Sequence, residues 1–272
     1  MKYRTRSEVH IGVDAGKRLT GISSVQFPGP SLPAHVLGVS TIESAAERAT
    51  RRERISWLDR YLDVLAGTIG SAMERSAVLM GGPGSDAMPH HYVNGINIED
   101  WAAIFRRGPG SVAVDPYHVE ITARAYDRLS RSWEHLGVRV RIVAPIEAKR
   151  AVGVESQVNV KAWKAAGRTP AQIARLKKDA VLNAVLALSD LGERIDGARK
   201  PEKWALADAT AIAFAGFRAE GAARIEHNTR GGGRSSEVDA TIKTTENYIP
   251  SPEDGGEPEG WRDPVARGHK GA

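Results

Sequence analysis

The first part of the chain carries short apolar runs separated by turn-forming residues. Three of these runs have the length and β-branched content of strands: Val9–Val13, Leu19–Phe27 and His35–Thr41. The first two are joined by a tight turn that contains Gly16, so they are expected to form a hairpin. The chain is therefore predicted to begin with a meander of strands, before any helix.

Further along, the apolar residues take a helical spacing, with short apolar runs in between. The longest amphipathic pattern predicts a helix from about Ala46 to Met73. The other predicted helices are Ile98–Arg106, Val119–Leu136, Ile173–Leu188 and Trp204–Phe217, and the other predicted strands are Ala77–Met80, Ser111–Val114 and Val138–Ala144. This order predicts an α/β fold with a mixed sheet, antiparallel in its first three strands and parallel afterwards, flanked by helices.

The composition changes near the C-terminus. The last fifty or so residues are rich in Gly, Pro and acidic side chains and have few apolar side chains to bury. We therefore predict a folded domain over residues 1–218 and a disordered tail over residues 219–272. Since no window approaches the roughly 20 unbroken apolar residues of a membrane span, the sequence argues against a transmembrane protein.

Charge and cysteine content limit the partners and metal sites that the protein can have. The chain has 38 Lys and Arg against 33 Asp and Glu, and residues 1–218 hold 31 of the basic and 23 of the acidic side chains. A basic body suits a polyanion such as DNA, although a soluble basic surface without a partner has the same composition. The absence of cysteine excludes disulfides, iron–sulfur clusters and thiolate zinc. A cytoplasmic protein is expected, and a metal would need oxygen or imidazole ligands.

Three acidic residues fall in apolar surroundings, where an ionised carboxylate is costly without a partner. Asp14 ends the first strand, Asp115 ends the apolar run SVAV, and Asp208 lies on the apolar helix WALADATAIAFAGF. One isolated acid of this kind is more often paired with a basic side chain, or caps a loop. Three of them from different elements can instead hold two Mg²⁺ or Mn²⁺ ions, which together catalyse phosphodiester cleavage.

All three of these acids lie in segments that resemble a known family. The segment VHIGVDAGKRLTGISSV, with Asp14, Gly16 and Gly21 in an Asp-x-Gly-x-x-x-x-Gly pattern, resembles the opening hairpin of phage-type RuvC-like Holliday junction resolvases. ADATAIAFA resembles the closing helix of that family, whose Asp corresponds to Asp208. The segment VAVDPYHVEITARAYDRLSRSWEHLGVRVRIVAP resembles its second acidic strand with the following helix and strand. The resemblance covers roughly residues 8–218.

The resemblance implies a ribonuclease H-like fold and a metal-dependent, structure-selective endonuclease that cleaves branched DNA, such as Holliday junctions, in DNA recombination or repair. It further implies two Mg²⁺ or Mn²⁺ ions as cofactors, four-way-junction DNA as partner and, usually, a homodimer. Asp14, Asp115 and Asp208 would hold the ions, and Lys149 and Lys178 would lie near the scissile phosphate. The basic residues expected to contact DNA are Lys17, Arg18, Lys161, Lys164, Arg168 and Lys177.

The middle acid departs from the family pattern. The family has Glu at the end of its second acidic strand, where this chain has Asp115. A different alignment would use the predicted strand Ala77–Met80 and place Gly81 at that position. We favour Asp115, because the expected helix and strand follow it directly. Under this alignment, residues 74–110 contain an insertion.

A second departure leaves other functions open. The family has a further acidic or metal-binding residue one helical turn before Asp208, and this chain has Ala205 there. The metal site is then incomplete, unless Glu202 or a loop acid supplements it. A catalytically inactive module that binds branched DNA is therefore an alternative. An ATP-binding protein of the sugar-kinase and actin fold, which opens with a similar hairpin, is a weaker one, since we find no second glycine-rich phosphate hairpin.

Overall fold

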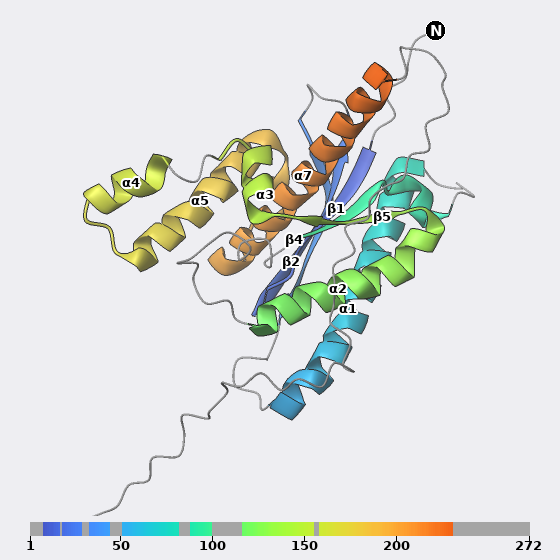
Figure 1. The fold of residues 1–272 in the computed structure, drawn as a ribbon, viewed down its shortest axis with the longest axis horizontal. Helices are drawn as coiled ribbons and strands as arrows, with labels where there is room; N and C mark the ends of the chain where they lie inside the picture. Colours follow the sequence, from blue (N-terminus) through green and yellow to red (C-terminus); the bar gives the residue numbers. More distant parts are fainter. Residues whose placement is uncertain are drawn as a thin grey trace, which may run out of the picture. The chain divides into compact units, whose positions relative to one another are not determined.

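The structure, a computed structural model, describes residues 8–16, 18–28, 33–43, 51–81, 88–99, 116–154 and 158–230, which lie in one compact unit (Figure 1). Its strands are β1 (Glu8–Asp14), β2 (Leu19–Phe27), β3 (His35–Glu43), β4 (Gly95–Glu99) and β5 (Arg139–Val143). The α-helices are α1 (Arg51–Gly81), α2 (Pro116–Trp133), α3 (Pro145–Ala151), α4 (Val158–Ala165), α5 (Pro170–Leu188), α6 (Leu191–Arg194) and α7 (Lys200–Arg230). The short 3-10 helices are η2 (Pro89–Tyr92) and η4 (Glu134–Leu136).

The described strands form one mixed sheet in the order β3-β2-β1-β4-β5. β2 is antiparallel to both β1 and β3, whereas β4 is parallel to both β1 and β5. The predicted hairpin and the predicted mixed sheet are therefore confirmed. The parallel register pairs Val13 with Ile98, so that the next residues, Asp14 and Glu99, end neighbouring strands at the same edge of the sheet.

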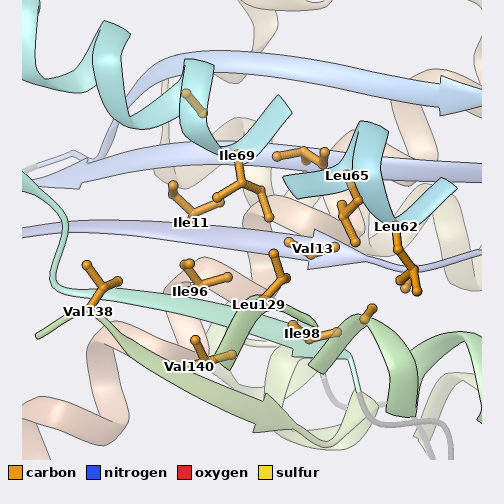
Figure 2. Close-up of a cluster of buried hydrophobic side chains, with 14 of the residues drawn as sticks. Ile11, Val13, Leu62, Leu65, Ile69, Ile96, Ile98, Leu129, Val138 and Val140 are labelled. Carbon is orange, nitrogen blue, oxygen red and sulfur yellow. The ribbon is translucent and has the colours of Figure 1, made fainter. Parts of the chain in front are cut away.

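One face of the sheet packs against α1 and α2 through a large apolar core. Successive residues of a strand point to opposite faces, and every second residue of β1 and β4 is Val or Ile. These side chains are buried together with Leu and Ile of the two helices, as Figure 2 shows for Ile11, Val13, Leu62, Leu65, Ile69, Ile96, Ile98, Leu129, Val138 and Val140. This core fixes which side chains of β1 and β4 must point to the other face.

The other face of the sheet is covered by α7, with α3 and α5 packed beside it (Figure 1). The residues of β1 and β4 that alternate with the apolar core are His10, Gly12, Asp14, Gly95, Asn97 and Glu99. A Cβ atom at Gly12 would overlap the carbonyl oxygen of Ala209, and one at Gly21 would overlap that of Ala205. The glycines therefore let the backbone of α7 lie directly on β1 and β2.

Several sequence predictions for the middle of the chain are wrong. Ala77–Met80 is not a strand but the end of α1, because this apolar run extends the helix, with Met80 against the core and Val78 and Leu79 exposed. A helix does not begin at Ile98, which lies in β4. The fourth strand thus falls inside residues 74–110, where an insertion was predicted, and Gly81 ends a helix and not a strand. The predicted strand Ser111–Val114 and its Asp115 lie outside the described residues.

The later elements follow the sequence more closely. α2, β5 and α5 agree with the predicted helix, strand and helix to within about three residues at each end. α7 begins before Trp204 and continues to Arg230, beyond the domain boundary that was predicted after Arg218. In the part of the chain that the structure describes, we find no helix whose apolar stretch is long enough to cross a membrane.

The close contact between α7 and β1 leads to a stability prediction. Gly12→Ala should lower the free energy of unfolding by about 3 kcal/mol, because the new methyl group would push α7 away from the sheet. The matched control is Gly67→Ala on α1, where a Cβ meets nothing within 4 Å. That substitution should raise the free energy of unfolding by about 0.5–1 kcal/mol through helix propensity. Urea unfolding of both variants tests the contact between α7 and β1. Equal changes in the free energy of unfolding for Gly12→Ala and Gly67→Ala would contradict it.

Candidate active site

Two carboxyl groups lie side by side where β1 and β4 end. Asp14 is 7% exposed and Glu99 is 8% exposed, and both belong to the face of the sheet that α7 covers. The two side chains lie within reach of each other, and each acts on the pKa of the other. Two buried carboxyl groups this close repel each other when both are ionised.

A third carboxyl group comes from α7. Asp208 lies on the helix segment that packs on Gly12 and Gly21, and its charge acts on both Asp14 and Glu99. Asp208 also accepts a hydrogen bond of 2.6 Å from Nζ of Lys178 on α5. The indole Nε1 of Trp204 on α7 donates to the neighbouring Asp179 at 2.8 Å, which fixes α5 against α7. The lysine therefore reaches the acids from a helix anchored next to them.

Burial and like charge raise the pKa of both strand acids. Burial raises the pKa of Asp14 to about 6, with a further rise from the charge of Asp208, against the lowering effects of Lys178, the Glu99 hydrogen bond and Lys149. Burial, then the charges of Asp14 and Asp208, raise the pKa of Glu99 well above its usual value. Desolvation alone would lower the pKa of Lys178, but the charges of Asp208 and Asp14 outweigh it and raise that pKa.

The donor set suits hard divalent cations. Asp14, Glu99 and Asp208 offer only carboxylate oxygens, which Mg²⁺ and Mn²⁺ prefer, and the chain has no cysteine thiolate to favour a softer metal. Burial and mutual repulsion make two ionised carboxylates costly at this place, as the raised pKa values of Asp14 and Glu99 show. A cation bound there would offset both costs.

The structure brings most of the sequence-predicted site residues together. Asp14, Asp208 and Lys178 lie in the cluster, and the charge of Lys149 on α3 acts on both strand acids. Asp115, the predicted middle acid, lies outside the described residues. Within them, Glu99 supplies the carboxyl group at the end of the strand next to β1, which is the position that the family fills with Glu.

Sequence reasoning missed Glu99 although a signal was present. The segment GINIE repeats the alternation of HIGVD in β1, with apolar residues toward one face and an acid at the end. At the helix position where the resemblance implies a fourth acid, this chain has Ala205, which is buried against Gly21. Glu202 does not replace it, because its carboxylate accepts hydrogen bonds from the backbone and side chain of Arg199.

A basic surface adjoins the acids. From Val158 to Leu188, α4, α5 and their connection carry six Lys or Arg and a single acid. The predicted DNA-contacting residues Lys161, Lys164, Arg168 and Lys177 are all exposed there, and Lys178 continues the series to Asp208. Arg18 lies just before β2, and Lys17 lies outside the described residues.

The chain has similarity to solved structures at low sequence identity. No protein-family model and no curated protein matches the chain. Thermus thermophilus RuvC is 17% identical, with 79% of this chain and 96% of that chain covered and a TM-score of 0.44. RuvC from T. thermophilus in complex with a Holliday junction substrate is 16% identical, with 78% and 95% covered and a TM-score of 0.42. The yeast mitochondrial Holliday junction resolvase Ydc2 is 13% identical, with 82% of each chain covered and a TM-score of 0.42.

The predicted mixed sheet, antiparallel in its first three strands, parallel afterwards and flanked by helices, is confirmed by the strand order and directions. The function has to be argued from the chemistry of the site. That chemistry consists of three converging carboxyl groups with a basic surface beside them.

The raised pKa of Asp14 predicts how stability depends on pH. Without metal, the folded protein takes up a proton on Asp14 below about pH 6, whereas the unfolded chain does so only near pH 4. The metal-free protein should therefore gain stability, on the order of 2 kcal/mol, as the pH falls from 7.5 to 5. Asp14→Asn should remove most of this gain in urea unfolding with EDTA, while the exposed Asp59→Asn should retain it. Equal pH dependence in both variants would contradict the site.

Proposed function

We propose that this protein is a divalent-metal-dependent endonuclease that cleaves phosphodiester bonds in branched DNA, such as a four-way junction. The observation that carries the proposal is the convergence of Asp14, Glu99 and Asp208 from β1, β4 and α7, with Lys178 bound to the cluster. The resemblance of the first hairpin and the last helix to junction resolvases supports branched DNA as the substrate.

Each group has a role that follows from its position. Asp14, Glu99 and Asp208 would hold one or two Mg²⁺ or Mn²⁺ ions, whose chemistry is to activate water and to stabilise the leaving oxygen. Glu99 must give up its proton before it can act as a ligand, because only the carboxylate binds a cation. Lys178 has its ammonium group beside Asp208, where it can also pair with a phosphate oxygen of the cleaved strand.

The basic surface of α4 and α5 would guide the DNA backbone to the acids. Its exposed lysines and arginines neutralise phosphates and release counterions, which favours binding without reading sequence. The homodimer that the resemblance implies would let two such sites cut two strands of one junction. Sedimentation velocity of the full chain tests the dimer. A cytoplasmic location and a role in DNA recombination or repair belong to the same proposal.

One observation favours a second candidate, an inactive module that binds branched DNA. Ala205 removes one acid that the family places beside Asp208, and Lys178 already neutralises Asp208 with an ion pair of 2.6 Å. A site with fewer acids and a resident ammonium group binds cations less strongly. Junction binding in a gel-shift assay, without nicking in Mg²⁺ or Mn²⁺, would establish this second candidate over the first.

The nuclease proposal predicts the effect of removing one carboxylate. Glu99→Gln should lower Mg²⁺-dependent nicking of a four-way junction at least about 100-fold, equivalent to roughly 3 kcal/mol of transition-state stabilisation. Junction binding should stay near the wild-type level, since the substitution removes no basic group. The control is Glu74→Gln, an exposed acid on α1, which should cleave like wild type. Wild-type cleavage by Glu99→Gln would show that Glu99 is no metal ligand.

The basic surface gives a prediction that depends on salt. Replacing both Lys161 and Lys164 with Gln should weaken junction binding at all sequences and lower the slope of log K against log salt by about 2, since each lost phosphate contact contributes about 0.9. Arg131→Gln on α2, the helix on the other face of the sheet, should leave the slope unchanged. Fluorescence anisotropy between 50 and 200 mM NaCl, for example, measures both. If the Lys161 and Lys164 variant has the same slope as the wild type, the DNA does not bind along this part of α4.

A further inference from the structure

A second cluster of potential metal ligands lies at the opposite end of β1. Glu8 and His10 on β1 and Glu220 on α7 each offer a ligand atom, and these three atoms lie within 4.8 Å of one another. The cluster is separate from the candidate active site, because Glu8 and Asp14 are six residues apart on a strand, or about 20 Å. Asp208 and Glu220 are twelve residues apart on α7, which is about 18 Å.

The imidazole of His10 is buried without hydrogen-bond partners among the described residues. The side chain is 1% exposed, and both Nδ1 and Nε2 are enclosed with no donor or acceptor in range. Phe27 and Phe217 contact the ring edge-on, with centroids at 5.8 Å and 5.9 Å. A buried polar group in such apolar surroundings is costly unless something satisfies it.

The separations in the cluster fit ligands of one shared ion. Nε2 of His10 lies 3.6 Å from Oε2 of Glu8 and 4.0 Å from Oε2 of Glu220, which is too far for a hydrogen bond. Ligands that surround a common ion at about 2.1 Å stand about 3.4 Å apart at the corners of a tetrahedron. The Glu8 and Glu220 side chains are 12% and 8% exposed, so the cluster is shielded from water.

We propose that Glu8, His10 and Glu220 bind one divalent transition-metal ion of the Zn²⁺ class, which ties the start of β1 to the second half of α7. One imidazole nitrogen and two carboxylate oxygens are ligands that Zn²⁺ accepts, with a water at the fourth position. Mg²⁺ is the poorer occupant, because it favours an all-oxygen set. Gly95 of β4 lies beside His10 and Glu220 and leaves room at that side of the cluster.

The test uses the full chain with Asp14→Asn and Asp208→Asn, so that Zn²⁺ cannot bind strongly at the other acids. After dialysis against EDTA and removal of the chelator, a competition titration with a chromophoric chelator should show one equivalent of bound Zn²⁺. At about a hundredfold excess over Kd, Zn²⁺ should raise the Tm by about 5–10 °C, and EDTA should reverse the rise. Co²⁺ should give visible absorption bands of a site with nitrogen and oxygen ligands.

His10→Phe in the same background should abolish both the bound equivalent and the Tm rise, since Phe fits between Phe27 and Phe217 but has no ligand atom. If that variant does not fold, Glu8→Gln at the partly exposed edge of the cluster is the substitute. Replacing His90 and His91, which lie on η2 away from the cluster residues in sequence, should change neither readout. No bound Zn²⁺ in the parent, or Zn²⁺ binding that survives the loss of His10 or Glu8, would overturn the proposal.

Discussion

The arrangement of the whole α7 face depends on one steric constraint, the contact of the α7 backbone with glycines. Gly12 and Gly21 remove the side chains that would separate the helix from β1 and β2, and Gly216 on the helix leaves room for the side-chain amide of Asn97 of β4. Close backbone approach of this kind is what a glycine allows and any larger residue prevents. As a result, Asp208 on the helix acts on the acids at the strand ends, although it is far from them in sequence.

The same packing separates two environments along the strands. Toward α1 and α2, β1 and β4 present only apolar side chains, and burial of these side chains drives folding. Toward α7, the same strands present polar groups and glycine, and these groups need partners because they are buried as well. Asp14 and Glu99 at one end of the strands and His10 at the other therefore follow from the same alternation of side chains along β1 and β4. Burial of the apolar face supplies the stability that offsets the cost of burying the polar face.

Local pattern was enough to predict Asp14 and Asp208, because each interrupts a long apolar segment. The pattern was weaker for Glu99, since GINIE repeats the alternation of β1 over only five residues and includes Asn97. The end of α1 was misread because AVLM has the composition of a strand but extends the helix, with Val78 and Leu79 exposed. The grouping of His10 with Glu220 had no local signal at all, because it arises only when α7 crosses the full length of β1.

The ion pair between Lys178 and Asp208 links two events that would otherwise be independent. In the structure the ammonium group of Lys178 pairs with Asp208, and under the proposed function it would also pair with a phosphate of the substrate. It cannot fully serve both partners at once. Under the proposed function, loading of the acids with a cation releases this lysine toward the substrate, so occupancy of one site changes the affinity of the other. Thermodynamic reciprocity then requires that the substrate strengthens cation binding by the same factor. The enzyme would thus assemble its working state cooperatively, without any movement of the sheet.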